Sequence, residues 1–209
     1  MTDAVEDAAL PTIADPRAQR AARLTRAIVL VLVGIVIAFT ATLHRDFEFD
    51  RWLLLASLAL IGAATLVEYR ALRDTLESWW VAARAIIAFA AAGSLIAIAD
   101  TTGMALVVVF WAVLTAVITL MRLARGVQPP RVALPSAVLS LALALVAFLV
   151  RDDSVAMVGF FGAYAVIRGV FLGISAFDGG ASNGGSSAMP ADHSADPDAP
   201  TTPRIESPS

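Results

Sequence analysis

The chain contains no cysteine and only two histidines among its 209 residues. Without cysteine, disulfides, thiol redox chemistry and metal sites built on thiolates are all excluded. His44 falls in a short loop and His193 in a polar tail, so a histidine-ligated metal centre is not expected either. The sequence also lacks a GxxxxGKS or GxxxxGKT phosphate-binding motif, a GxGxxG motif after a strand and the zinc motif HExxH. These absences predict a protein that is not an enzyme and has no catalytic, cofactor-binding or metal-binding residues.

Charge is also scarce along the chain. Only 16% of the residues are charged, 58% are hydrophobic, and the mean hydropathy is +0.77. Soluble domains carry about 25% charged residues, and one soluble core of this size could not hide so much apolar surface. No basic patch with interleaved aromatic residues is present, so nucleic acid is not an expected partner. The composition predicts a membrane protein whose main partner is lipid.

Six apolar segments of helical length divide the chain. About 20 apolar residues are needed to cross a hydrocarbon layer of about 30 Å, and none of the segments alternates as a strand of a membrane barrel does. The sequence therefore predicts an all-α membrane protein with six transmembrane helices in a domain of residues 24–178. Residues 1–23 and 179–209 are poor in large apolar residues and are predicted to be disordered cytoplasmic segments. The predicted spans are residues 27–43, 52–67, 79–99, 103–121, 132–150 and 154–177.

Polar residues at the segment boundaries predict where the helices begin. Asp50, Thr102 and Ser154 precede apolar runs and are predicted N-caps, because their side-chain oxygens can accept from free amides of the first turn. Pro135 is predicted in the first turn of the fifth helix, where its missing N–H has little effect.

Arginine is distributed unevenly between the two sides of the predicted bundle. In membrane proteins, the loops on the cytoplasmic side carry an excess of arginine and lysine. The arginine-rich side includes the N-terminal segment and the second and fourth loops, so both termini are predicted in the cytoplasm. Arg17, Arg20, Arg23, Arg26, Arg70, Arg73, Arg122, Arg125 and Arg131 lie on that side, against Arg45, Arg51 and Arg151 on the other.

The second helices of three successive hairpins align at a step of 50 residues. Residues 60–62, 110–112 and 160–162 correspond, Thr65 aligns with Thr115, and Glu68 aligns with Arg168. The opening helices are looser, although residues 26–28 resemble residues 84–86. The alignment predicts three repeated helical hairpins, although apolar sequence of low complexity can also imitate such a period.

A family resemblance follows from this hairpin pattern. Residues 84–86, the acidic tip around Asp100, residues 159–164 and residues 168–169 resemble the HdeD-like family of acid-resistance membrane proteins. The likeness covers residues 24–178. It implies a six-helix protein of the bacterial cytoplasmic (inner) membrane that is linked to acid stress, and it carries over no functional residue.

Three ionisable residues lie within the predicted spans. Glu68, Arg84 and Arg168 share a depth near the cytoplasmic side, and a charge inside a span is unfavourable by about 2.5–3.5 kcal/mol at a helix centre. One interpretation is a buried cluster that senses pH or relays protons, in which Glu68 and Arg168 neutralise each other. The other, which the nearness of the interface favours, is that the arginines reach the headgroups and Glu68 lies at the water boundary.

Small residues recur every four positions in the sixth segment. Ala165, Gly169 and Gly173 would place one narrow strip on the helix surface. Spans associate in lipid by such close approach of their backbones. The strip is predicted to pack inside the bundle, with a homo-oligomer interface as the alternative.

These observations lead to one functional hypothesis and two alternatives. The first is a non-enzymatic multi-pass protein of acid-stress adaptation. The second is a small transporter or proton-coupled permease that uses Glu68, Arg84 and Arg168. The third is an accessory subunit that recruits a cytoplasmic protein partner through residues 179–209.

Overall fold

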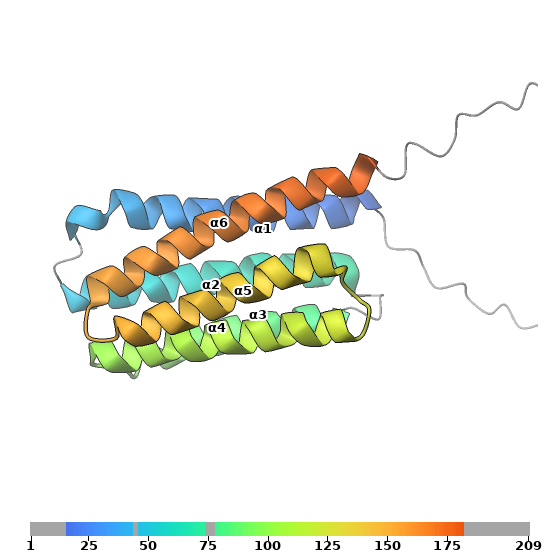
Figure 1. The fold of residues 1–209 in the computed structure, drawn as a ribbon. Helices are drawn as coiled ribbons and strands as arrows, with labels where there is room; N and C mark the ends of the chain where they lie inside the picture. Colours follow the sequence, from blue (N-terminus) through green and yellow to red (C-terminus); the bar gives the residue numbers. More distant parts are fainter. Residues whose placement is uncertain (1–15, 44–45, 74–77, 182–209) are drawn as a thin grey trace, which may run out of the picture.

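The computed structural model describes residues 16–43, 46–73 and 78–181, and these ranges form a bundle of six long α-helices that run alternately up and down (Figure 1). No strand occurs within them, so the predicted all-helical class is confirmed. The helices are α1 (Pro16–Phe39), α2 (Phe47–Leu72), α3 (Ser78–Ser94), α4 (Thr101–Ala124), α5 (Pro130–Leu149) and α6 (Ser154–Ala181), with a short 3-10 helix, η1 (Ala41–Leu43), after α1. Helix α1 begins before the predicted domain boundary at residue 24 and α6 continues past residue 178. The remainder of both predicted terminal segments lies outside the described residues.

Five of the described helices are long and apolar enough to cross a membrane, namely α1, α2, α4, α5 and α6. Helix α3 has 17 residues, which corresponds to about 25 Å of helix. The chain therefore has the character of a multi-pass membrane protein.

The third predicted segment ends earlier than its hydropathy indicated. A helix through residue 99 was expected, but α3 ends at Ser94. Gly93 and Ser94 are weak helix formers, and the Ser94 hydroxyl donates to the Ala91 carbonyl at 2.8 Å. The amide of Ile96 then bonds the Gly93 carbonyl three residues back, at 3.2 Å. The prediction of a helix through residue 99 is therefore wrong, because local polar bonds and tight turns end it.

Aspartates begin three of the helices. Their carboxylates accept from the amides of the first turn at 3.0–3.1 Å, and negative charge is favourable at that end of a helix. The predicted caps lie one to four residues too late, because each was placed at the start of the apolar run rather than at the preceding acid. The capping residues are Asp46, Asp100 and Asp153 rather than Asp50, Thr102 and Ser154. Pro135 lies inside α5, while Pro130 is the first residue of that helix.

Packing in the bundle is most extensive between α1 and α6, between α4 and α5, and between α2 and α3. These are not the pairs within the predicted hairpins, which would be α1 with α2, α3 with α4 and α5 with α6. The first and last helices thus lie side by side, and they close the bundle (Figure 1).

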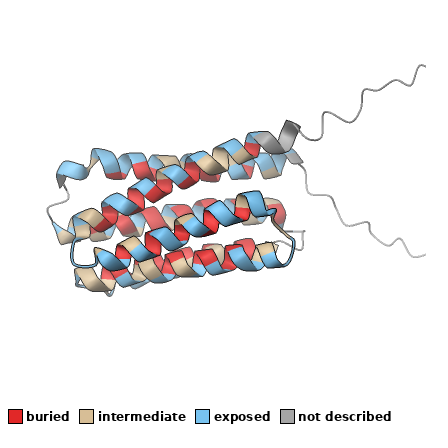
Figure 2. Ribbon diagram, viewed as in Figure 1, coloured by how far each residue is buried: buried red, intermediate tan, exposed pale blue. Residues whose placement is uncertain are grey.

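Buried and exposed residues alternate along each helix, so that each helix has one buried face and one exposed face (Figure 2). Leu54, Met104 and Phe161 are fully buried. The outer surface is also apolar, with large exposed side chains such as Phe39, Phe110 and Leu145. A soluble protein rarely exposes so large an apolar area, whereas lipid tails solvate it.

Candidate functional site

A small cavity with three arginines in its wall lies inside the bundle. Arg26 of α1, Arg84 of α3 and Arg168 of α6 line it, and its volume is about 10 Å³. That volume is on the order of one water molecule. The rest of the wall combines apolar and hydroxyl-bearing side chains: Leu30, Ile61, Thr65, Ala88, Trp111, Thr115 and Tyr164.

The carboxylate of Glu68 forms a buried ion pair beside this cavity. Nη1 of Arg26 donates to Oε2 of Glu68 at 2.9 Å, which links α1 to α2. The two residues are 5% and 8% exposed, respectively. Glu68 lies about 6 Å before the end of α2. Removal of one partner from such a pair leaves a buried charge unpaired, which destabilises by about 3–5 kcal/mol.

Arg168 is held by a separate hydrogen-bond network. Its Nη1 donates to Oγ of Ser140 on α5 at 2.8 Å, and it also donates to the hydroxyl of Tyr164 one turn earlier on α6. The Ser140 and Tyr164 oxygens are themselves 3.2 Å apart. Arg168 is only 3% exposed, so its guanidinium is fixed in the bundle by hydroxyls rather than by a carboxylate.

Arg84 differs from the other two arginines. It lies about 9 Å after the start of α3 and is half-buried. Within the described ranges its guanidinium makes no hydrogen bond or ion pair with another residue. It interacts electrostatically with Arg26 and Arg168 across the cavity, and with Glu68 and Arg122. Arg84 therefore contributes positive charge to the cavity that no hydrogen-bonded carboxylate neutralises.

The structure brings Arg84 and Arg168 to one cavity and places Glu68 next to it, as part of a cluster that also contains Arg26. The expected Glu68–Arg168 pair is not formed, because Glu68 binds Arg26 and Arg168 binds hydroxyl groups. Arg26 was assigned to the cytoplasmic arginines that precede the first span. The repeat alignment contained the signal for its placement, because it matches residues 26–28 with residues 84–86.

Aromatic rings of α4 and α6 pack together at the cavity wall. The Trp111 ring lies 5.6 Å from that of Phe161 and 5.8 Å from that of Tyr164, between ring centroids. Ile61, Trp111 and Phe161, which correspond in the alignment at a step of 50 residues, are all buried. These contacts seal one side of the charged cluster with apolar surface.

The predicted small-residue strip of α6 faces α1. A Cβ atom built on Gly169 would lie 2.9 Å from the Ala27 carbonyl oxygen and 2.8 Å from Cγ2 of Val31. Gly173 lies further away, with the Ala27 Cβ at 4.0 Å, and Ala165 is fully buried. The strip brings α6 close to the helix that carries Arg26, so it positions the cluster.

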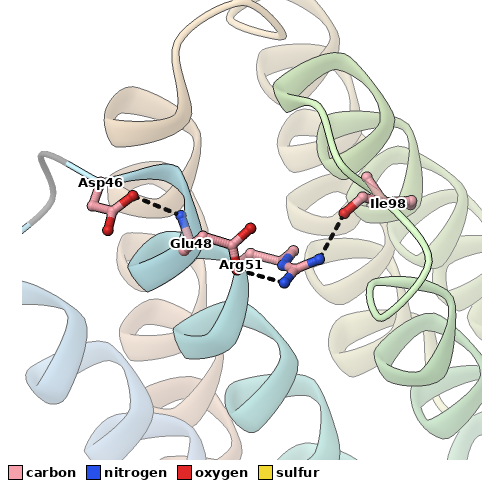
Figure 3. Close-up of polar contacts among 4 residues, drawn as sticks. All are labelled: Asp46, Glu48, Arg51 and Ile98. Atoms are coloured by element: carbon pink, nitrogen blue, oxygen red, sulfur yellow. Dashed lines mark hydrogen bonds and ion pairs between the residues drawn. The ribbon is translucent and has the colours of Figure 1, made fainter.

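A second polar group lies at the opposite end of the bundle, where α2 begins (Figure 3). The Arg51 guanidinium donates to the Ile98 carbonyl at 3.0 Å and pairs with Glu48 at 2.5 Å. The buried carboxylate of Asp50 accepts from the Ser154 hydroxyl at 2.7 Å. Asp46 serves as a cap, so the acidic residues here have structural partners. Within the described residues, no group of three or more His, Asp and Glu side chains is arranged to hold a metal ion.

Comparison with known proteins yields no matching family model, no matching curated protein and no matching solved structure. Conclusions about function therefore rest on the cluster itself. Its geometry combines a carboxylate that can take up a proton with cationic groups that cannot lose theirs near neutral pH. Such a group can change its net charge with pH and can hold an anion.

Proposed function

We propose that this chain is a non-enzymatic six-helix protein of the bacterial cytoplasmic membrane that takes part in acid adaptation. The observation that carries the proposal is the buried Arg26–Glu68 ion pair, which joins α1 to α2 at 2.9 Å. The resemblance of residues 24–178 to the HdeD-like family of acid-resistance membrane proteins also supports a role in acid adaptation. In this proposal the protein responds to acid through its own packing, with Glu68 as the group that takes up the proton.

The six-span topology with both termini in the cytoplasm is supported by three features. Helix α3 is followed by further apolar residues, which lengthen the apolar segment beyond its 17 helical residues. Arginines lie over aromatic rings at the ends of helices, where interfacial residues belong, as in Arg125 over Trp80 at 5.2 Å and Arg51 over Trp52 at 5.5 Å. The arginine-rich loops are all on the side that holds Pro16 and Ala181.

Protonation of Glu68 would change the balance of forces inside the bundle. The ionised carboxylate faces Arg26 of α1, Arg84 of α3, Arg122 of α4 and Arg168 of α6. Once protonated, it no longer offsets the repulsion among these arginines. Because these arginines come from four different helices, the expected result is a looser bundle at the cytoplasmic side, which is a change in shape driven by acid.

Survival after acid challenge tests this proposal in cells that lack the gene. Wild-type protein is expected to restore survival. Glu68→Gln keeps the size of the side chain and mimics its protonated form, so it is expected to restore survival too, and to hold the looser bundle already at neutral pH. Asp152→Asn is the matched control, because this carboxylate is 80% exposed at the opposite end of the bundle. If deletion leaves survival unchanged, the acid-adaptation proposal is wrong. If proteolysis of the purified Glu68→Gln protein shows the bundle loosening between neutral and acidic pH as wild type does, the ion pair is not the responsive element.

The transporter alternative shares the same cluster but needs a route through the protein. In this conformation the cavity has room for about one water molecule, which suits a proton rather than an organic substrate. The accessory-subunit alternative depends on residues 182–209, which lie outside the described residues. It predicts loss of function after truncation behind Ala181, whereas the acid-adaptation proposal predicts that the truncated protein still restores survival.

A further inference from the structure

We infer that the cavity between Arg26, Arg84 and Arg168 is a binding site for a small monovalent inorganic anion of the size of chloride. This inference does not depend on a role in acid adaptation. It follows from the charge around the cavity, from the donors that have no partner among the described residues and from the cavity's size.

The charge around the cavity is not balanced among the described residues that form it. Three arginines line it, and Glu68 beside it is the carboxylate paired with one of them, so the four groups together carry two positive charges. Buried charge without a counter-charge is strongly unfavourable. A bound anion would neutralise part of the excess.

Several guanidinium donors remain available to such an anion. Nε of Arg26 is buried and has no hydrogen-bond partner among the described residues. Arg84 likewise has no hydrogen-bond partner in these ranges, although a guanidinium offers five N–H donors. The three arginines come from α1, α3 and α6, so an anion between them would be approached from several directions. The site is therefore built from two buried cationic side chains, Arg26 and Arg168, and the half-buried Arg84, on three separate helices.

The size of the cavity selects the class of anion. A volume of about 10 Å³ accommodates one water-sized particle, so a halide fits with small adjustments of the side chains. A phosphate group, of a lipid or of a free phosphate ion, has five heavy atoms and exceeds the space for one water-sized particle. Apolar walls, including Leu30 and Trp111, further favour a weakly hydrated monovalent ion over a multivalent one.

Trp111 provides a direct reporter, because its ring lines the cavity and bromide quenches indole fluorescence on contact. The protein would be purified in detergent with gluconate as the background anion at constant ionic strength, and bromide would be titrated. Wild type is expected to show a saturable quenching component in addition to linear collisional quenching of the exposed tryptophans. The saturable component should disappear in Trp111→Phe and should be displaced by chloride.

Two variants are expected to shift bromide affinity in opposite directions. Arg84→Gln removes a positive charge that makes no hydrogen bond to the described residues, so the half-saturating bromide concentration should rise at least tenfold. Glu68→Gln removes the negative charge beside the cavity, so the same concentration should fall at least tenfold. Loosening alone would weaken binding in both variants, whereas an anion that offsets the repulsion among the arginines binds more tightly once Glu68 no longer offsets it. Opposite shifts therefore separate a site from damage. If Arg84→Gln does not fold, Glu68→Gln still tests the inference: a fall in its half-saturating bromide concentration supports the anion site, and a rise contradicts it.

Purely linear quenching in wild type, or no change in the half-saturating concentration in either variant, would overturn the inference. Inorganic phosphate and phosphatidylglycerol vesicles are tested as competitors in parallel. Neither is expected to displace bromide. Displacement by either would assign the site to a phosphate group and reject the small monovalent anion, with the vesicle result separating lipid from free phosphate.

Discussion

Gly169 gives a quantitative test of how closely α6 approaches α1. A methyl group at this position would lie 2.8 Å from Cγ2 of Val31, 2.9 Å from the Ala27 carbonyl oxygen and 3.0 Å from Cβ of Leu30. Optimal separations between non-bonded carbons are about 3.5–4.0 Å. The backbone oxygen and the Cβ atom cannot rotate away, so the two helices must move apart.

Gly159 is the matched control on the same helix. A Cβ atom built there meets no atom within 4 Å. Replacement of either glycine by alanine gains helix propensity of about 1 kcal/mol, so the difference between the two variants isolates the steric conflict. Overpacking of this kind costs about 1–3 kcal/mol, and Gly169→Ala is therefore expected to be less stable than Gly159→Ala by that amount.

The assay is unfolding of the purified protein in detergent, by heat or by titration with sodium dodecyl sulfate, followed by tryptophan emission. Val31→Ala in the Gly169→Ala background should restore only part of the lost stability, because it removes one of the three short contacts. Equal stability of the two single alanine variants would refute the close packing of α6 on α1. Because Arg26 lies on α1, next to the contact with Gly169, its position in the cluster would then be refuted as well.

Three further predictions concern other parts of the molecule. Arg51→Gln removes a charged donor to the loop after α3 and should raise hydrogen exchange there, corresponding to a loss of about 1–3 kcal/mol; Arg151→Gln, at the same end of the bundle, should leave that loop unchanged. Because the chain has no cysteine, Gln128→Cys and Asp152→Cys can be labelled individually in intact cells. An impermeant maleimide should react with the second and not the first, and the reverse result would contradict the cytoplasmic placement of the termini. The ionised form of Glu68 is the one that its ion pair stabilises, so the free energy of unfolding should fall as the pH drops and Glu68 takes up its proton. Glu68→Gln should flatten this dependence in equilibrium unfolding measurements, and an unaltered slope would exclude Glu68 as its source.

Hydropathy was sufficient to predict the helical class and the approximate place of each helix, because a long apolar run has few other stable conformations in lipid. The helix ends were less predictable. The caps Asp46 and Asp100 lie before the apolar runs they start, so a reading based on hydropathy places the helix start too late. The end of α3 depends on a hydroxyl bond and on tight turns, which leave no trace in hydropathy.

The candidate site was predictable only in part. Glu68, Arg84 and Arg168 stood out because charges are rare in spans, but their partners depend on which helices touch. The Arg26–Glu68 pair requires α1 to pack beside α2 at one rotation of each helix. Ser140, the partner of Arg168, is an ordinary small residue in an apolar helix. Nothing in its sequence neighbourhood distinguishes it from the other serines.

The packing of α1 against α6 has a consequence for the biosynthesis of the protein. The ribosome releases α1 well before α6, yet these two helices form one of the most extensive contacts in the bundle. Until the final helix is inserted, the surface of α1 that receives Gly169 has no neighbour, and the ring of helices stays open. Premature termination anywhere before α6 would leave this surface facing lipid or other proteins, where membrane quality-control proteases can recognise an incomplete bundle. Closure of the bundle therefore waits for the insertion of α6, after the five preceding helices are already in the membrane.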